Sequence, residues 1–317
     1  MPKSLSKSSP TSSQNPSQNH RAAFLSLLVL TMIWGYNWVV MKIGIAYASA
    51  LDFAAMRLVL GALSLFLALI ALRKPLRPKA VPGTILLGLM QNTATVGLIT
   101  WALVNGGAGK TAVLNYTMPF WLLLFSWIFL KETLRRSQWL SVGMAVTGLL
   151  LVLMPLDLSS GLGSKIIAVG AGICWAISAV LARVLQRDQQ LDLLSMSAWQ
   201  MLFGSIPLAI AAWMLPTQPI VWSPTFIAAL LYNAVPAAAI AWLLWFYALN
   251  NLPVGTAGLS TLAAPVIGVL AAWLQLGERP SGLEGLGMVL ILVALTINAV
   301  QTIQTERQAK NQAKLSA

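Results

Sequence analysis

The chain has 317 residues, of which 58% are apolar and 9% are charged, and its mean hydropathy is +0.77. Soluble domains carry roughly 25% charged residues, so this composition excludes a soluble globular protein and predicts an all-α integral membrane protein. The net charge of +12 resides almost entirely in short loops and tails, which indicates a topology signal, so we expect no nucleic-acid partner.

Residues 1–21 are rich in Ser, Gln, Asn and Pro and are predicted to be a disordered cytoplasmic tail. An apolar run of about twenty residues follows, long enough to cross roughly 30 Å of hydrocarbon as a helix. A cleaved signal peptide is the competing interpretation, because Ala48-Ser49-Ala50 resembles a cleavage site. The run is longer than the usual signal core of roughly 7–15 residues, and Trp34 and Trp38 are heavy for such a segment. We therefore expect a first transmembrane helix.

Apolar segments separated by charged residues or by Pro and Gly predict ten transmembrane helices. They cover residues 22–42, 51–72, 82–104, 109–130, 137–154, 164–185, 193–214, 223–249, 254–276 and 283–303. Residues 304–317 are predicted to form a second cytoplasmic tail. The eighth and ninth segments are separated only by the four residues 250–253.

The Lys and Arg residues separate cleanly when the N-terminus is placed in the cytoplasm. Fifteen then lie inside: Lys3, Lys7, Arg21, Arg73, Lys74, Arg77, Lys79, Lys131, Arg135, Arg136, Arg183, Arg187, Arg307, Lys310 and Lys314. Four lie outside, namely Lys42, Lys110, Lys165 and Arg279, while Arg57 falls within the second segment. Because short cytoplasmic loops are enriched in Lys and Arg, this bias predicts ten spans with both termini cytoplasmic.

An internal repeat relates the two parts of the chain. Residues 111–143 resemble residues 256–287, and Pro119 precedes Glu132 by the same interval that separates Pro265 from Glu278. Each copy belongs to five predicted helices, in residues 22–154 and 164–303. Since five is odd, the second half enters the membrane from the opposite face, which predicts two inverted five-helix repeats. In membranes such repeats are typical of transporters.

Weaker echoes join other positions of the two halves. Trp34 of the first predicted helix matches Trp175 of the sixth. Arg57 and Gly61 of the second helix match Gln200 and Gly204 of the seventh, with the same spacing of four.

Several motifs occur in order along both halves. They are Trp34-Gly35-Tyr36-Asn37, Arg57, the block Pro119…Leu130-Lys131-Glu132…Gly143…Gly148, and its repeat Pro265…Gly277-Glu278-Arg279…Gly287. With these motifs, residues 22–303 resemble the EamA-type branch of the drug/metabolite transporter superfamily. The resemblance implies a ten-helix secondary carrier of the inner (plasma) membrane, often an exporter of amino acids or related amphipathic metabolites. Four-helix relatives use a glutamate in their first helix for proton coupling, and this chain has no carboxylate there.

Polar residues near the middle of predicted spans are the first candidates for a substrate site, because they are costly in a bilayer. They are Gln91 and Asn92 in the third helix, Asn115 and Tyr116 in the fourth, Tyr232 and Asn233 in the eighth, and Ser260 and Thr261 in the ninth. The resemblance implies that these four helices line a central cavity. Hydrogen bonding between helices is the alternative, and it explains Ser260 and Thr261 equally well.

Trp34 and Trp175 form a second group of candidates. Each has a polar residue three positions further on, Asn37 and Ser178, so each pair shares a helix face. Such faces can give a cavity an aromatic wall for an apolar or cationic substrate, although packing between helices explains the pair as well. Most other tryptophans, including Trp101, Trp242 and Trp245, are interpreted as an interface belt or as lipid-facing side chains.

Pro119 and Pro265 are predicted hinges. Each removes a backbone hydrogen bond within a helix and frees the carbonyl four residues earlier, at Asn115 and at Thr261. That matched helices of both halves carry such a proline favours a mechanical role.

Charged residues within or beside the spans have structural interpretations first. An ion pair with Asp52 is our first interpretation of Arg57, and an anion-attracting vestibule is the second. Glu132 and Glu278 stand at helix ends beside basic residues and are interpreted as caps or interfacial gates.

The sequence disfavours rival functions. An intramembrane enzyme needs a His, a Cys or a carboxylate pair at depth, and the single His20 and Cys174 supply none, so we expect no enzyme, metal or cofactor. No phosphate-binding loop of an ATP-driven pump is present. A channel-like facilitator remains the alternative to a carrier. The expected partners are a small-molecule substrate and the lipid bilayer, and the sequence leaves monomer and homodimer undetermined.

Overall fold

The computed structural model describes residues 16–105, 108–132, 136–153, 162–189, 191–215, 218–277, 279 and 281–315, and within them every regular element is helical. The elements are α1 (Pro16–Gly44), α2 (Ala50–Ala71), α3 (Val81–Gly88), η1 (Leu89–Val96), α4 (Gly97–Asn105), α5 (Ala108–Asn115), α6 (Met118–Phe125), η2 (Ser126–Leu130), α7 (Arg136–Leu153), α8 (Leu162–Gln189), α9 (Leu193–Met214), α10 (Pro224–Tyr232), η3 (Asn233–Ile240), α11 (Ala241–Asn251), α12 (Val254–Ser260), α13 (Ala263–Leu276) and α14 (Gly282–Leu315). The all-helical expectation is confirmed for these residues.

Seven helical segments of the described chain are long and apolar enough to cross a membrane: Asn19–Gly44, Ala50–Ala71, Val81–Val104, Ile166–Gln189, Leu193–Met214, Pro224–Asn251 and Val254–Leu276. Three further apolar helices, Met118–Leu130, Trp139–Leu151 and Gly285–Ala294, are shorter. They fall within the fourth, fifth and tenth predicted spans. By length and composition, therefore, seven of the ten predicted spans are found, and the protein is a multi-pass membrane protein.

The distribution of side chains is that of a membrane protein. Large apolar side chains such as Leu67, Trp213 and Leu274 are exposed on the outside of the bundle, Trp213 to 86%. Polar side chains such as Gln91 and Asn233 are fully buried inside it. Water would be a poor solvent for this outer surface, whereas lipid chains would cover it without cost.

The third and eighth predicted spans, which correspond in the two halves, each contain a π-helical stretch. The run α3–η1–α4 and the run α10–η3–α11 each pass through eight π-helical residues near their middle. In η3, Pro236 lacks a backbone N–H, so the regular α-helical hydrogen bonding cannot continue through it. In η1, Gln91 and Asn92 are buried in the interior.

Two other segments are broken just before the predicted hinge prolines. Helix α5 ends at Asn115 and α6 begins at Met118, beside Pro119, while α12 ends at Ser260 and α13 begins at Ala263. The carbonyl that each proline was expected to leave without a partner has different surroundings at the two breaks. The Thr261 carbonyl accepts the N–H of Ala264 at 2.9 Å, because a tight turn links α12 to α13, so that expectation was wrong. The Asn115 carbonyl oxygen faces Gly172 of α8, where a Cβ would lie 2.7 Å away.

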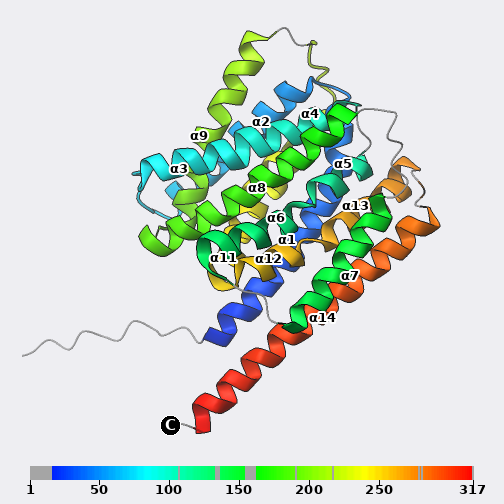
Figure 1. The fold of residues 1–317 in the computed structure, drawn as a ribbon. Helices are drawn as coiled ribbons and strands as arrows, with labels where there is room; N and C mark the ends of the chain where they lie inside the picture. The colour runs from blue at the N-terminus through cyan, green and yellow to red at the C-terminus, as the bar shows by residue number, and fades with distance from the viewer. Residues whose placement is uncertain are drawn as a thin grey trace, which may run out of the picture.

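The helices of the two predicted halves pack in matched pairs (Figure 1). Helix α1 packs against α13 and α11, and α8 correspondingly packs against α6 and α4. Helix α2 packs against α9 and η3, and α9 against α2 and η1. Helices α7 and α14 lie side by side at one edge of the bundle.

Contacts at the ends of the helices are matched as well. Lys42 Nζ, near the end of α1, donates to the Leu103 carbonyl near the end of α4 at 3.1 Å. Arg183 Nη1, near the end of α8, donates to the Leu249 carbonyl near the end of α11. Each bond joins the first and third predicted helices of one half.

The predicted tails are partly helical. Helix α1 begins at Pro16, so residues 16–21 belong to it, and α14 continues from the predicted span to Leu315. The reason is that adding a residue to an existing helix costs far less than starting one. Residues 1–15 lie outside the described residues.

Candidate functional site

A cavity of about 50 Å³ lies where the two predicted halves meet. It is lined by Trp34, Asn37, Trp38, Met41, Arg57, Thr95, Val96, Ile99, Asn115, Tyr116, Trp175 and Trp242. Trp175 of α8 and Trp242 of α11 come from the second half, and the other lining residues from the first. The volume gives room for a few water molecules.

A tryptophan cluster, made of Trp34, Trp175, Trp242 and Trp245, forms one wall of this cavity and the layer behind it. The ring centroid of Trp34 lies 5.2 Å from that of Trp175 and 4.8 Å from that of Trp242, both edge to face. Trp34 Nε1 also donates to the Ala237 carbonyl of η3 at 3.0 Å. Edge-to-face contacts of buried rings contribute roughly 0.5–1.5 kcal/mol each beyond area burial, so the cluster is a firm contact between the halves.

The interface-belt interpretation was wrong for Trp242 and Trp245, which are almost fully buried. They lie three residues apart on the face of α11 that turns inward, beside the small residues Ala241 and Ala248. The small residues on the same helix face were the signal in the sequence that would have marked these two tryptophans as buried. Trp101, by contrast, is 64% exposed, as a lipid-facing side chain is expected to be.

Asn37 and Asn115 bring amide groups to the cavity that the protein does not fully satisfy. Asn37 Nδ2 donates to Met41 Sδ at 3.0 Å, but Oδ1 of Asn37 and Oδ1 of Asn115 have no hydrogen-bond partner among the described residues. Both side chains are buried. Unpaired buried polar atoms are costly, so their presence beside a cavity marks places for ligand contacts.

Arg57 lines the same cavity and is only 4% exposed. Its Nη1 lies 3.2 Å from Met41 Sδ, its Nε has no partner, and no ion pair joins it to any carboxylate that the structure describes. The predicted pairing with Asp52 is therefore wrong. Asp52 belongs to the first turn of α2, where its Oδ2 accepts the Ser49 hydroxyl at 2.7 Å and its N–H is capped by Ser49 Oγ.

The other predicted site residues do not line this cavity, and their role in binding stays a prediction. Four of them bond between helices: Gln91 Oε1 lies 3.3 Å from Ser178 Oγ, Asn92 Nδ2 donates to Gln200 Oε1 at 2.6 Å, and the Tyr232 hydroxyl donates to the Ile33 carbonyl at 2.9 Å. Three bond within their own segments: Asn233 to Ala229, Ser260 to Thr256 and Thr261 to Gly258.

Glu132 connects the halves at the face predicted to be cytoplasmic. Its Oε2 accepts the backbone N–H of Val254, the first residue of α12, at 3.0 Å. The predicted role as a cap agrees with this bond, since a carboxylate is favourable at a helix N-terminus. Its counterpart Glu278 lies outside the described residues.

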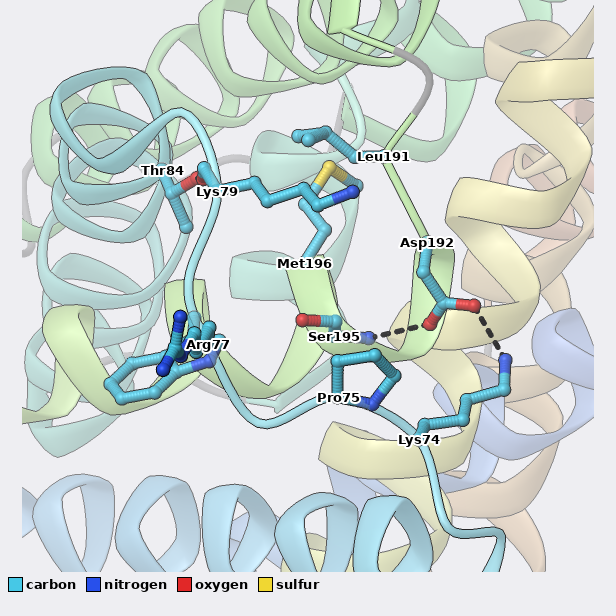
Figure 2. A pocket seen from close by; sticks show the side chains of 10 residues that line it. Lys74, Pro75, Arg77, Lys79, Thr84, Leu191, Asp192, Ser195 and Met196 are labelled. Carbon is cyan, nitrogen blue, oxygen red and sulfur yellow. Dashed lines mark hydrogen bonds and ion pairs between the residues drawn. The ribbon is translucent and has the colours of Figure 1, made fainter.

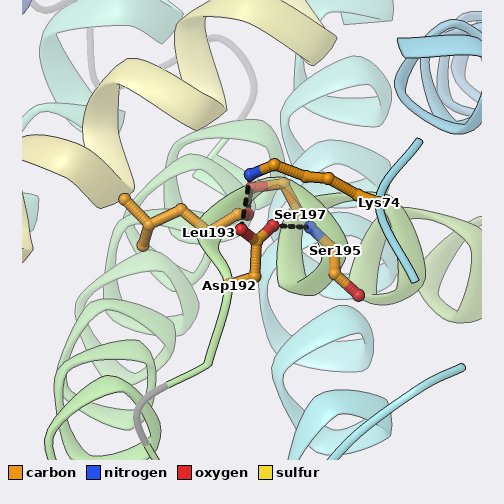
Figure 3. A network of polar contacts seen from close by, with 5 residues as sticks. All are labelled: Lys74, Asp192, Leu193, Ser195 and Ser197. Atoms are coloured by element: carbon orange, nitrogen blue, oxygen red, sulfur yellow. Dashed lines mark hydrogen bonds and ion pairs between the residues drawn. The ribbon is translucent and has the colours of Figure 1, made fainter. Parts of the chain in front are cut away.

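A second pocket, of about 80 Å³, lies between the loop after α2 and the start of α9 (Figure 2). Lys74, Arg77 and Lys79 of the loop line it, and Lys74 Nζ pairs with Asp192 Oδ2 at 2.5 Å. Asp192 Oδ1 also accepts the N–H of Ser195 at 3.0 Å, a bond that caps α9 (Figure 3). These charged side chains are partly exposed, so this pocket is a loop contact and not a second buried site.

Comparisons with known proteins agree on the kind of protein to which this chain is similar. The profile of the "EamA-like transporter family" matches twice, at residues 21–154 and 164–300. The "Uncharacterized transporter YoaV" of Bacillus subtilis is 28% identical and is matched over 86% of this chain and 95% of that protein. A "Probable amino-acid metabolite efflux pump" of Salmonella typhimurium is 27% identical over 88% of this chain and 95% of that protein. A solved crystal structure, 19% identical, has a TM-score of 0.74 over 90% of this chain and 99% of that chain, so the fold is shared.

Proposed function

The chain belongs to the EamA-like transporter family, and on this premise we propose that it is a secondary active transporter that exports small metabolites by alternating access. The observation that carries this proposal is the cavity between the two halves, lined by tryptophans from both and by unsatisfied polar groups. Substrate sites of such carriers lie where two structural repeats meet. The relatives named as efflux pumps support export and support amino acids or related amphipathic compounds as the cargo.

We infer that the three shorter apolar helices also cross the membrane, which gives ten spans. The contacts between helix ends support this count. With ten alternating spans, Lys42–Leu103 and Tyr47–Val221 fall on one face, and Lys74–Asp192, Glu132–Val254 and Arg183–Leu249 on the other. Each of these contacts joins ends that the alternation assigns to one face, as ten full crossings require.

We also propose that the halves are inverted repeats. The bond from Lys42 to Leu103 has its counterpart in the bond from Arg183 to Leu249, and under alternation the two lie on opposite faces. The bond from Val221 N–H to the Tyr47 carbonyl is matched in the same way by the Lys74–Asp192 pair. An axis in the membrane plane relates opposite faces, whereas an axis along the membrane normal does not.

The orientation follows from the same assignment. We propose that both termini are cytoplasmic in the inner (plasma) membrane, because the face carrying the loop after α2 holds Arg73, Lys74, Arg77 and Lys79. Cysteines placed at Tyr47 and at Lys79 in a Cys174→Ala background test this orientation. An impermeant maleimide added to intact cells should label the first and spare the second, and the reverse pattern would refute the orientation.

The hinge role of Pro119 and Pro265 belongs to the same proposal. Both prolines stand immediately after breaks in matched helices, α5–α6 and α12–α13, and α6 contacts α12. Replacing either proline with alanine allows a continuous helix at the break. We expect such variants to bind substrate as the wild type does and to exchange it more slowly, and unchanged exchange would remove the hinge assignment.

Counterflow in proteoliposomes tests the transporter proposal. Vesicles are loaded with an unlabelled metabolite from a screen of amino acids, and uptake of the labelled compound is followed from a dilute outside solution. A carrier gives saturable uptake that transiently exceeds equilibrium. Its binding site carries unlabelled substrate out of the vesicle and returns with labelled substrate. A flux that rises linearly with the gradient and shows no counterflow would identify a channel-like facilitator instead.

A further inference from the structure

The guanidinium of Arg57 is a buried cation without a counterion. Among the described residues, its neighbours at the cavity are aromatic rings, amides, a hydroxyl, a thioether and aliphatic side chains, and none carries a negative charge. Its one hydrogen bond within the described residues is to the sulfur of Met41, a weak acceptor. A buried cation in this situation is costly, and in membrane proteins such residues face a cavity and a partner of opposite charge.

The fold does not need a cation at this position. The repeat pairs Arg57 with Gln200, and both stand four residues before a glycine that lies close to the other half, Gly61 and Gly204. Gln200 is also fully buried, but its side-chain oxygen accepts Asn92 Nδ2 at 2.6 Å. One half therefore fills the site with a neutral amide bound to a neighbouring helix, whereas the other half presents a charge to the cavity.

The remaining lining narrows what the charge can bind. One cation with no second basic residue in the lining balances a monoanion and leaves a dianion such as a phosphate monoester half neutralised. A guanidinium matches a carboxylate in shape and donates two parallel hydrogen bonds to it. Trp175 Nε1 is a further buried donor without a partner, and the rings of Trp34, Trp38 and Tyr116 offer an apolar surface beside it.

We propose that Arg57 binds the carboxylate of the transported solute, so that the substrates are monocarboxylates with an apolar or aromatic body. This inference rests on the proposed transporter function, since it assigns the cavity as the substrate site. The unpaired Oδ1 atoms of Asn37 and Asn115 lie in the same lining and can accept hydrogen bonds from donors elsewhere on the solute.

The test measures binding to the purified protein in lipid nanodiscs by thermal shift and tryptophan fluorescence. The probes are monocarboxylates of rising size, acetate, benzoate, phenylalanine and indole-3-acetate, each beside its neutral amide, together with phenyl phosphate. The variants are Arg57→Gln, which copies the residue of the matched position, and Arg57→Lys. Arg77→Gln removes the same charge from an exposed loop residue and is the matched control.

We expect at least one carboxylate to bind wild type and Arg77→Gln, with its amide roughly tenfold weaker or more. Arg57→Gln should lose this preference, and Arg57→Lys should retain part of it. Without any ligand, Arg57→Gln should melt at or above the temperature of the wild type, because it removes an unpaired buried charge. A merely structural arginine would instead lower the melting temperature and leave the acid-to-amide ratio unchanged.

Several outcomes would overturn the proposal: amides that bind as well as acids, an Arg57→Gln variant that keeps the preference for acids, no response to any carboxylate, or phenyl phosphate as the strongest ligand. Counterflow separates this failure from failure of the transporter function. A protein that exchanges neutral or cationic solutes without regard to Arg57 remains a carrier and refutes only the carboxylate assignment. A protein that binds carboxylates through Arg57 but shows no counterflow refutes the carrier and leaves the binding site.

Discussion

Asn92 and Asn115 are both buried asparagines of the first half, but their surroundings differ. Asn92 donates to the side chain and to the backbone carbonyl of Gln200, at 2.6 and 3.3 Å, and so ties η1 to α9. Oδ1 of both residues lacks a hydrogen-bond partner among the described residues, but only the Asn115 side chain lines the cavity. The first residue holds helices together, whereas the second faces the cavity in which we propose that the substrate binds.

Alanine substitutions distinguish these two roles. Asn92→Ala leaves Gln200 buried without its partner and should lower the free energy of unfolding by roughly 1–3 kcal/mol. Asn115→Ala should lower stability less than Asn92→Ala, because it leaves no hydrogen-bonded partner behind, and it should reduce counterflow several-fold. Thermal unfolding and counterflow of both variants check this. A destabilised Asn115→Ala with normal transport would reverse the assignment.

The lowered pKa of Asp192 makes the stability of the Lys74–Asp192 contact depend on pH. Partial burial of the Asp192 carboxyl acts to raise its pKa, but the hydrogen bond and charge of Lys74 and the N–H groups of Ser195 and Leu194 outweigh it, so the net pKa is lowered. A carboxyl with a lowered folded pKa stabilises the fold above its unfolded pKa, about 4. This stabilisation is lost as the pH falls through the lowered value.

Asp192→Asn should therefore reduce stability at neutral pH, and this loss should shrink as the pH falls through the lowered pKa of Asp192. Both side chains of the pair are about two-fifths exposed, so solvent screening limits the effect to roughly 0.2–1 kcal/mol. Asparagine keeps the helix cap, so the difference reports the charge alone. Unfolding measured against pH for wild type, Asp192→Asn and Lys74→Gln provides the check. A stability difference that widens toward low pH would contradict a lowered pKa of Asp192.

Part of the candidate site follows from the sequence and part does not. Repeat matching and polarity identified Trp34, Asn37, Asn115, Tyr116 and Trp175, which line the cavity. They did not separate these from Gln91 and Asn92, because a buried amide bonded to a neighbouring helix has the same sequence signal as one facing a cavity. The surroundings of Arg57 also depend on which way its long side chain turns, and that choice is made by packing.

At the scale of helices, a close contact between α3 and α9 is built on two glycines. A Cβ on Gly204 would collide with the Gly88 carbonyl oxygen and would lie 2.7 Å from the Asn92 Cβ. A Cβ on Gly88 would collide with the Gln200 carbonyl oxygen. The missing side chains let the backbones approach, and this approach brings Asn92 within hydrogen-bonding distance of Gln200.

Gly204→Ala should destabilise the protein by roughly 1–3 kcal/mol, because the neighbouring backbone has to move to admit the methyl group. Gly170→Ala in α8 is the matched control, since a Cβ there meets nothing within 4 Å. The control should be neutral or stabilising by up to about 1 kcal/mol, because alanine is the better helix former. Thermal unfolding of the two variants measures the contrast. Equal stability of the two would show that α3 and α9 leave room for a methyl group between them.

The helical ranges could be predicted from the sequence, but the irregularities within the helices could not. Periods of apolar residues between charged and Pro-containing segments mark the helical ranges, because length and hydropathy are local properties of the chain. The π-helical stretches η1 and η3 were not foreseen, since apolar periodicity does not distinguish π-helical from α-helical hydrogen bonding. The prolines predicted the two helix breaks, but the turn that satisfies the Thr261 carbonyl is set by the local fold.

At the scale of the whole molecule, the proposed transport depends on two halves that move against each other around the cavity. The tryptophan cluster and the bond from the Val254 N–H to Glu132 join the halves, and the latter lies on the side that we assign to the cytoplasm. The bond from Val221 to Tyr47 joins the halves on the other side. The cavity of about 50 Å³ is too small for most metabolites, so the proposed transport requires the halves to separate when a substrate enters.

Cysteine accessibility within the cavity tests this alternation most directly. Val96→Cys in a Cys174→Ala background places one thiol in the lining, and its reaction with a small impermeant methanethiosulfonate is timed from each side, in intact cells and in inverted vesicles. A second variant adds Glu132→Cys and Val254→Cys, which a short bifunctional maleimide cross-links before labelling. Alternating access predicts reaction from both sides without the cross-link. With the cross-link, it predicts loss of labelling from the cytoplasmic side and faster labelling from outside. Labelling from one side only, or an outside rate that the cross-link leaves unchanged, would contradict alternating access.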